Sequence, residues 1–101
     1  MICKSYRNFF MNFSNEANLR IIASLRHGAL CVNSIVERTN LEQSAVSHCL
    51  RNLRECRIVS VKRNGKERMY SLNEETVVPL LAMVERHVEK NCERCDVYGK
   101  K

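Results

Sequence analysis

Glycine, proline and long apolar runs are scarce in this chain of 101 residues. It has three glycines and one proline, unlike the loop-rich small scaffolds that disulfides hold together. No run approaches the roughly 18–20 apolar residues that span a membrane, and residues 1–7 contain no continuous apolar segment of a secretory signal. We therefore expect a cytoplasmic protein without a membrane partner, whose six cysteines lie in a reducing environment.

The residue groups of common catalytic sites are missing as well. The sequence has no glycine-rich phosphate loop and no pair of carboxylates placed for acid–base chemistry. Its three histidines, His27, His48 and His87, are scattered along the chain and do not form a triad with the thiols. We therefore predict that the protein is not an enzyme.

The length of the chain allows a single domain with one modest core. Hydrophobic residues make up 45% of the sequence, and the last ten residues are mostly polar. The predicted organisation is therefore one domain over residues 1–91, followed by a polar, cysteine-containing C-terminal tail over residues 92–101.

Apolar periodicity predicts a first helix near the N-terminus. Ile2, Tyr6, Phe9 and Phe13 recur at i, i+4, i+7 and i+11, which is the spacing of one helical face. This helix holds most of the aromatic residues of the chain. We therefore expect its apolar face to be buried against another surface.

A second helix is expected between a capping signal and a glycine. Ser14-Asn15 can cap its N-terminus, and His27-Gly28 can end it with glycine in the position after the helix. Its predicted core stripe consists of Leu19, Ile22 and Leu25. A brief third helix is expected over about residues 34–38, with Thr39-Asn40 ending it.

The fourth predicted helix, over about residues 43–56, is strongly amphipathic. Its apolar face, at i, i+3, i+4 and i+7, consists of Val46, Cys49, Leu50 and Leu53. We interpret Cys49 and Cys56 as small core hydrophobes. The opposite face carries Ser44, Ser47, His48 and Arg51 with the same spacing.

A hairpin and a last helix complete the predicted fold. Strands beginning at Ile58 and Met69 flank Asn64-Gly65, the strongest short hairpin signal in the chain. A fifth helix is expected from about Glu74, and Pro79 fits if that helix starts just before it or kinks there. The predicted apolar stripe of this helix consists of Val77, Leu81, Val84 and Val88.

Positive charge is concentrated on the fourth helix and the hairpin. Residues 51–68 contain seven cationic and two acidic side chains, a balance of +5 against +6 for the whole chain. Such segregation is typical of a surface that meets a polyanion. The pattern therefore predicts a mainly α fold with a β-hairpin wing, in the α+β class: a winged helix-turn-helix with about five helices.

In such a fold the fourth helix enters the DNA major groove and the wing lies along the backbone. Serine hydroxyls suit phosphates, while longer polar side chains of the helix reach base edges. The predicted DNA-binding residues are Gln43, Ser44, Ser47, His48 and Arg51 of the helix, and Arg63, Lys66 and Arg68 of the wing.

Several segments together resemble the ArsR/SmtB repressors, which are small winged-helix homodimers. The similarity extends over about residues 13–90 and is carried by residues 15–21, 29–32, 41–50, 53–55 and 68–72. Its core signature, Gln-Ser-x-Val-Ser-x-x-Leu-x-x-Leu, matches Gln43 to Leu53 throughout. The chain departs from the family at Arg57, where relatives usually carry a helix-ending glycine.

The resemblance implies a sequence-specific transcriptional repressor that binds double-stranded DNA at a palindromic operator. It also implies a homodimer formed through the first and last helices, in agreement with their apolar stripes, and release from DNA when an inducer binds. An interaction module for protein or RNA, with a structural zinc or with no ligand, is the alternative that we keep open.

The cysteines supply the candidate inducer site. Where the family's arsenic and cadmium site usually reads Cys-Val-Cys, this chain reads Cys31-Val32-Asn33 and lacks one thiolate. The candidate metal ligands are therefore the closely spaced pair Cys92 and Cys95, joined by Cys3 or Cys31, or by His87 or a thiol of a second protomer. Such thiolates suit Zn(II), Cd(II) or As(III). A reversible disulfide between Cys92 and Cys95 and an inert pair are the alternatives.

Overall fold

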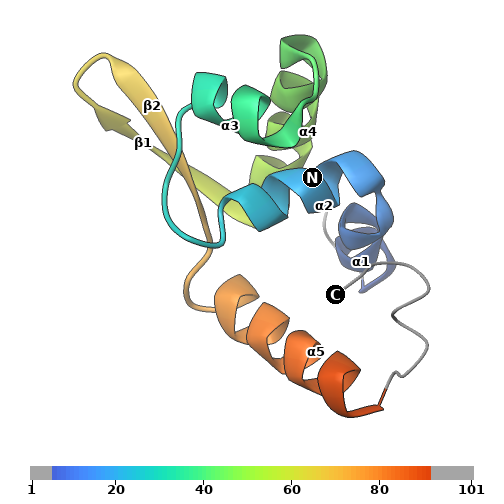
Figure 1. Ribbon diagram of the computed structural model, residues 1–101. Helices are drawn as coiled ribbons and strands as arrows, with labels where there is room; N and C mark the ends of the chain where they lie inside the picture. The colour runs from blue at the N-terminus through green and yellow to red at the C-terminus, as the bar shows by residue number, and fades with distance from the viewer. Residues whose placement is uncertain (1–5, 92–101) are drawn as a thin grey trace.

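The structure is a computed structural model that describes residues 6–91. Five helices and one two-stranded antiparallel hairpin follow one another along the described chain (Figure 1). They are α1 (Tyr6–Ser14), α2 (Glu16–Ser24), α3 (Val32–Thr39), α4 (Gln43–Glu55), β1 (Val59–Asn64), β2 (Glu67–Leu72) and α5 (Val77–Asn91). This is the predicted winged helix-turn-helix. The predicted tail over residues 92–101 lies outside the described residues.

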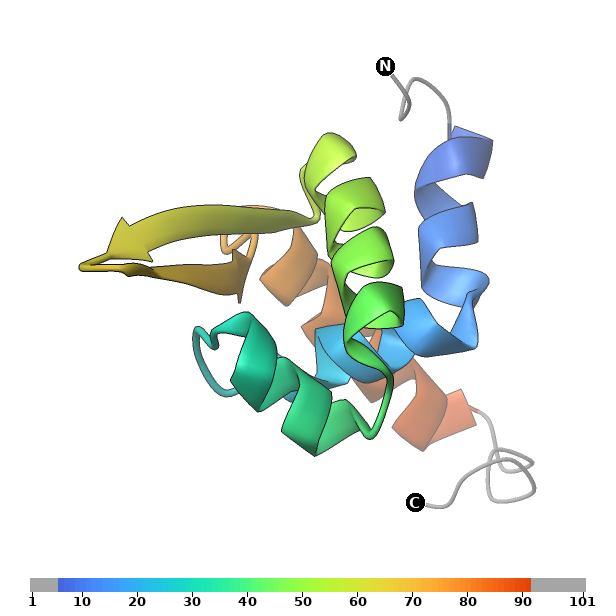
Figure 2. The ribbon, with the colours of Figure 1, turned by 90° about the horizontal axis from the view of Figure 1, so that it is seen from above.

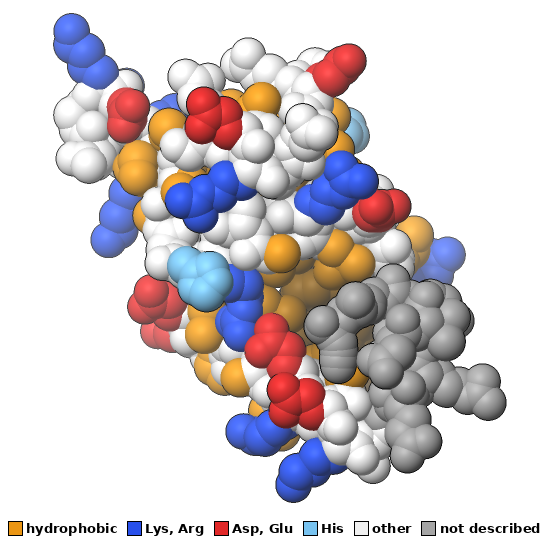
Figure 3. Space-filling view, in the orientation of Figure 1, with side chains coloured by type: hydrophobic (Ala, Val, Ile, Leu, Met, Phe, Trp, Pro, Cys, Tyr) orange, Lys and Arg blue, Asp and Glu red, His pale blue; other side chains and the backbone are white. Residues whose placement is uncertain are grey.

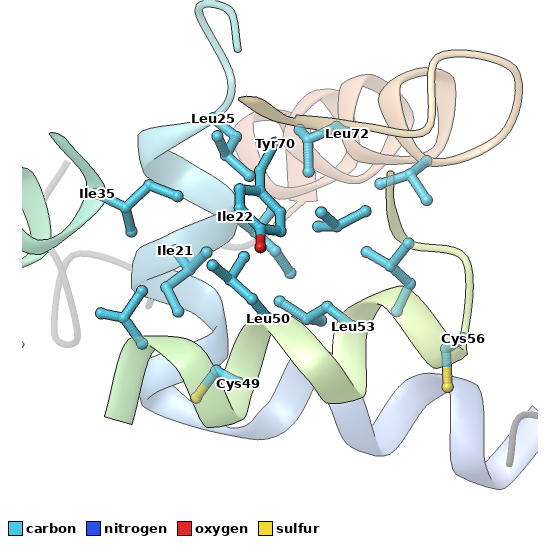
Figure 4. Close-up of a cluster of buried hydrophobic side chains, with 14 residues drawn as sticks. Ile21, Ile22, Leu25, Ile35, Cys49, Leu50, Leu53, Cys56, Tyr70 and Leu72 are labelled. Carbon is cyan, nitrogen blue, oxygen red and sulfur yellow. The ribbon is translucent and has the colours of Figure 1, made fainter. Parts of the chain in front are cut away.

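The core lies between α2, α3, α4 and the base of the hairpin (Figure 4). All four residues of the predicted apolar face of α4 are buried, which confirms that prediction. Ile21 of α2, Ile35 of α3 and Leu53 of α4 have no exposed surface. Burial of each such side chain contributes on the order of 1.5–3 kcal/mol, so these contacts fix α4 relative to the other two helices.

The turn between α3 and α4 is held by a chain of hydrogen bonds. Asn40 ends α3 in the left-handed conformation, with φ of 63°. The Thr39 hydroxyl donates to the carbonyl of Ile35 at 2.8 Å and accepts from the Leu41 amide at 3.3 Å. Arg20 of α2 donates to the Thr39 carbonyl at 3.2 Å. The start of α4 is thereby fixed to both helices that precede it.

The start of α2 and two of its three predicted core residues, Ile22 and Leu25, agree with the sequence analysis, whereas Leu19 and the end of the helix do not. The Asn15 side chain accepts from the Asn18 amide at 3.0 Å, as predicted for a helix cap. The helix ends at Ser24 rather than at the predicted His27-Gly28. Leu19, predicted to lie in the core, is 43% exposed, because the buried face of α2 instead runs through Asn18, Ile21 and Ile22.

The hairpin is longer than predicted, and its loop lies one residue later. Asn64 pairs with Glu67, so the loop consists of Gly65 and Lys66 instead of Asn64-Gly65. Gly65 has φ of 68°, which glycine adopts without steric cost. The loop between α2 and α3 is joined to the hairpin, because Leu30 and Tyr70 exchange two backbone hydrogen bonds of 2.9 and 2.8 Å.

The helix α5 starts at Val77, three residues after the predicted start. The Asn73 side chain caps the turn before it by accepting from the amides of Glu75 and Thr76. Pro79 is therefore the third helical residue, where a missing N–H leaves no helical hydrogen bond unmade. The prediction that this proline marks a helix start just before it is confirmed.

The helices α1 and α5 carry large apolar side chains at the surface. Tyr6 is 87% exposed, and Phe10, Met11, Met83 and Val84 are exposed as well. Figure 3 shows hydrophobic side chains lining a hollow above α5. The predicted burial of the first helix is correct for Phe9 and Phe13, which pack partly against the core. Tyr6 is not covered by its own chain, so its burial against a second surface stays a prediction, and Ile2 lies outside the described residues.

The two cysteines at the end of α4 differ in their chemistry. Both are buried, as predicted. Both belong to the core cluster, which confirms their predicted place in the core. Cys49 is a free thiol, whereas Cys56 is disulfide-bonded, which the sequence analysis did not predict. Figure 4 shows the Cys56 sulfur pointing out of the core cluster, and Asn12 of α1 donates to it at 3.2 Å. Sequence spacing could not reveal this disulfide, because it depends on which segments meet in space.

No helix within residues 6–91 is both long and apolar enough to cross a membrane.

Candidate nucleic-acid interface

One face of α4 is entirely polar and open to solvent. Its residues are the five that the sequence analysis assigned to DNA binding: Gln43, Ser44, Ser47, His48 and Arg51. They lie opposite the four buried residues of the same helix, so the contacts that bury one face aim the other outward. The His48 ring lies 3.4 Å from the Asn52 amide nitrogen, one helical turn further along.

A shallow groove joins this face of α4 to the hairpin. It has a volume of about 320 Å³, and Ser47, Arg51 and Arg68 all line it. Two predicted residues of the helix and one of the wing therefore share one continuous surface. Arg54 lines the same groove, although the sequence analysis did not include it. Its spacing, seven residues after Ser47 and three after Arg51, is the helical signal that could have identified it.

The remaining predicted wing residues lie at the far end of the hairpin. The hairpin extends away from the helices (Figure 2), and Arg63, Lys66 and Arg68 are exposed on it. Arg63 pairs with Arg68 across the two strands. Like charges in directly opposed positions destabilise a sheet, and no carboxylate of residues 6–91 forms an ion pair with either arginine. An approaching polyanion would relieve that repulsion.

Arg57 has an unusual backbone at the junction between α4 and β1. Its φ is 59°, a left-handed conformation that costs a residue with a side chain more than it costs glycine. The amide of Ile58 bonds to the carbonyl of Leu53, and the Asn73 side chain donates to the Arg57 carbonyl at 3.0 Å. The surrounding backbone therefore holds this conformation in place.

The candidate metal ligands are mostly outside the described residues, which include Cys31 but not Cys3, Cys92 or Cys95. Within residues 6–91, no group of three or more His, Cys, Asp or Glu side chains could hold a metal ion. Cys31 is a free thiol that precedes α3. The hydroxyl of Ser34, 3.6 Å from its sulfur, lowers the pKa of the Cys31 thiol and favours the thiolate.

Residues 15–61 match the family model described as "Bacterial regulatory protein, arsR family". The matched segment begins at the N-cap of α2 and ends in β1, so it contains α2, α3 and α4.

Three curated relatives match a longer part of the chain than the family model does. The Transcriptional repressor SmtB homolog of Synechocystis is 34% identical over 82% of this chain and 63% of its own length. The regulator NmtR of Mycobacterium tuberculosis is 41% identical over 75% of this chain and 63% of its length. The Transcriptional repressor SdpR of Bacillus subtilis is 30% identical over 65% of this chain and 73% of its length. The match thus spans less than two thirds of each of the first two relatives.

Solved structures share the architecture. Rv0081 of M. tuberculosis superposes with a TM-score of 0.76 at 26% identity, covering 83% of this chain and 85% of that one. A domain of Mycobacterium bovis, described as a homodimeric winged helix-turn-helix DNA-binding domain, superposes with a TM-score of 0.75 at 24% identity. It covers 92% of this chain and 94% of its own. The second similarity supports the fold alone.

Proposed function

Because the chain belongs to the ArsR family of bacterial regulatory proteins, we propose that it binds operator DNA as a homodimer and represses transcription in the cytoplasm. The observation that carries this proposal is the surface on which Ser47 and Arg51 of α4 meet Arg68 of the wing. It combines short hydroxyl donors with guanidinium groups on a helix and a hairpin, as recognition of phosphates and base edges requires.

In the proposed complex, α4 lies in the major groove and the wing follows the neighbouring backbone. Gln43, His48 and Arg51 contact base edges, and an arginine can bind guanine O6 and N7 at once. Ser44 and Ser47 contact phosphates. Arg63, Lys66 and Arg68 bind the backbone or enter the minor groove.

The proposed dimer is formed by α1 and α5. Exposed Phe10 and Met11 on α1 and Met83 and Val84 on α5 would be covered by the same surfaces of a second copy. A two-fold dimer presents two α4 helices, and each reads one half of a palindrome. The half-sites would then lie about one helical turn, 34–36 Å, or a multiple of it apart.

The experiment that tests DNA recognition compares a cation of α4 with a cation of the wing. An operator is first selected from random duplex, and affinity is measured for that operator and for an unrelated duplex. Arg51→Ala should cost about 1–3 kcal/mol on the operator and relax sequence preference. Lys66→Ala is the matched control, and it should weaken binding to both duplexes alike. Equal, non-selective losses would remove Arg51 from base readout.

Salt dependence separates this proposal from a protein- or RNA-interaction module. For duplex DNA, the logarithm of affinity should fall with the logarithm of salt concentration by roughly 0.9 per neutralised phosphate. A protein that binds no duplex at low salt, or that prefers single-stranded RNA, would contradict the proposed function.

Release by a thiol-binding ion is a further part of the proposal. It is favoured by the lowered pKa of the partly buried Cys31 thiol, because the thiolate is the form that binds metals. Reduced protein is titrated with Zn(II), Cd(II) and As(III) while thiolate absorbance and operator release are followed. Replacing Cys92 and Cys95 together by Ser should abolish both responses, with Cys31→Ser as the parallel variant. Unchanged release by the double variant would assign the sensor to other residues, and release by oxidant alone would indicate a redox switch.

A further inference from the structure

A second, larger groove lies behind the wing. It has a volume of about 1000 Å³ and is lined by the end of α2, the end of α4, the hairpin and the first turn of α5. Side chains alternate between the two faces of a strand, so Ser60 and Ser71, which line it, face away from Arg68 and Tyr70 of the interface groove. We name this cavity the rear groove.

The rear groove is cationic. Arg26, Arg54, Arg57 and Lys62 line it, and Glu74 is the one acidic residue among the described lining residues. Arg26 forms an ion pair of 2.9 Å with Glu85. No carboxylate within residues 6–91 forms an ion pair with the other three cations. Clustered like charges in a concave surface raise the local concentration of anions.

The rear groove also offers apolar surface and hydroxyl groups. Its apolar surface comes from exposed Ala29 and partly buried Val78. The side chains of Val59 and Leu72 lie instead in the core, on the strand face that carries Tyr70. The hydroxyls of Ser60 and Ser71, 3.4 Å apart, are exposed on the two strands. A volume of this size, with apolar walls and a few convergent polar groups, is typical of small-molecule sites. Its chemistry matches a ligand with one anionic group and an apolar body.

The backbone at Arg57 provides an independent reason to regard the rear groove as a site. Arg57 keeps a left-handed φ of 59°, although glycine adopts this conformation without cost. The residue that carries this strain contributes a guanidinium to the rear groove. Strained conformations of this kind cluster at ligand sites, where the side chain has a task that glycine cannot perform.

We infer that the rear groove binds a small organic carboxylate with an apolar chain, and that this ligand changes DNA affinity. Arg54 and Arg57 hold the carboxylate, and Ala29 and Val78 contact the chain. Arg54 lines both grooves. A carboxylate that binds the Arg54 guanidinium in the rear groove therefore draws this side chain away from the groove that faces DNA. The coupling to DNA rests on the proposed function, whereas the binding of the carboxylate does not.

The binding test uses octanoate as the probe and amide NMR shifts of the full-length protein as the readout. Octanoate should shift the amides of Ser60 and Asn73 saturably, whereas octanol, which has the same chain without the charge, should not. Arg57→Gly removes the cation and also the backbone strain, so it should fold at least as well as wild type and bind octanoate about tenfold more weakly. Arg38→Ala is the matched control, because exposed Arg38 lies on α3 and does not line the rear groove, and the octanoate affinity of this variant should be unchanged.

Three results would overturn the assignment: the absence of saturable shifts, equal octanoate affinity of wild type and Arg57→Gly, or the same shifts produced by octanol. If duplex DNA rather than octanoate shifts these amides, the rear groove is a backbone contact and the assignment is also wrong.

The coupling is measured separately, as operator affinity with and without saturating octanoate. We expect at least a fivefold loss, a coupling at the low end of the usual range, that is absent from Arg57→Gly. Unchanged operator affinity with octanoate bound would overturn the regulatory role. A protein that binds octanoate and no DNA would contradict the proposed function and leave the carboxylate site standing.

Discussion

The helices α4 and α5 have similar lengths and equally regular apolar stripes, yet only one of them finds its partner within the chain. All four stripe residues of α4 are buried. In α5 only Val77 is buried, while Met83 is 61% and Val84 48% exposed. Periodicity therefore identifies the face that a helix will bury, but it does not identify the surface that covers it.

This difference between α4 and α5 separates two regions of the molecule. The helices α2, α3 and α4 and the base of the hairpin form a core that is complete in one chain, and this core aims the cationic surface outward. The helices α1 and α5 expose apolar surface that a single copy leaves in water. In the proposed complex, DNA recognition depends on the complete region, and the spacing of the two α4 helices depends on the incomplete one.

The largest effect should come from removing a core side chain of the complete region. Leu53 has no exposed surface, and Leu53→Ala leaves a cavity in the contact between α4 and the other helices. We expect the free energy of unfolding to fall by about 2–5 kcal/mol, measured by urea denaturation. Met83→Ala on α5 also shortens a large apolar side chain to alanine. Measured in a variant that does not dimerise, it should change the free energy of unfolding by no more than about 0.5 kcal/mol. Equal losses would mean that α5 is packed within its own chain.

Sequence patterns predicted the complete region better than the incomplete one. The buried face of α4, the Asn15 cap and the fold class were all predictable, because each depends on residues close together in the chain. Tyr6 was predicted to lie on an apolar face that another surface covers, and its own chain leaves it exposed. No local pattern describes which surface covers it.

The same limit applies to the candidate site. The polar face of α4 was predictable from helical spacing, and the wing from its charges. The meeting of Arg51 with Arg68 in one groove, and the disulfide bond of Cys56, depend instead on how α4 packs against distant segments. A pattern along one helix contains no information about those distances.

A smaller change on α5 tests whether the exposed stripe is a dimer surface. Val84→Glu should weaken self-association at least about a hundredfold, because an unpaired carboxylate in an apolar interface is costly. The fold of each protomer should be retained, since Val84 is already half exposed. Sedimentation at micromolar concentration should then show dimers for wild type and monomers for the variant.

Ala82→Glu is the control for this substitution, because it adds the same charge to α5 outside the stripe. It should leave the dimer intact. Dimers of unchanged affinity in Val84→Glu would assign the interface to another surface.

The smallest expected effect concerns two thiols, one buried in the complete core and one closer to the surface. Burial raises the pKa of the Cys49 thiol on the core face of α4, whereas the Ser34 hydroxyl lowers the pKa of the more exposed Cys31 thiol. Since only the thiolate reacts with iodoacetamide, Cys31 should be labelled faster than Cys49 at neutral pH, as peptide-resolved mass spectrometry can measure. A lowered pKa keeps the thiolate present as pH falls, so labelling of Cys31 should persist to lower pH than that of an ordinary thiol.

Ser34→Ala removes the largest cause of the shift and should move the labelling profile of Cys31 toward higher pH while leaving Cys49 unchanged. If the pH profile of Cys31 labelling is the same in Ser34→Ala as in wild type, the Ser34 hydroxyl does not stabilise the thiolate. The proposal that Cys31 binds a metal as a thiolate would then lose its electrostatic support.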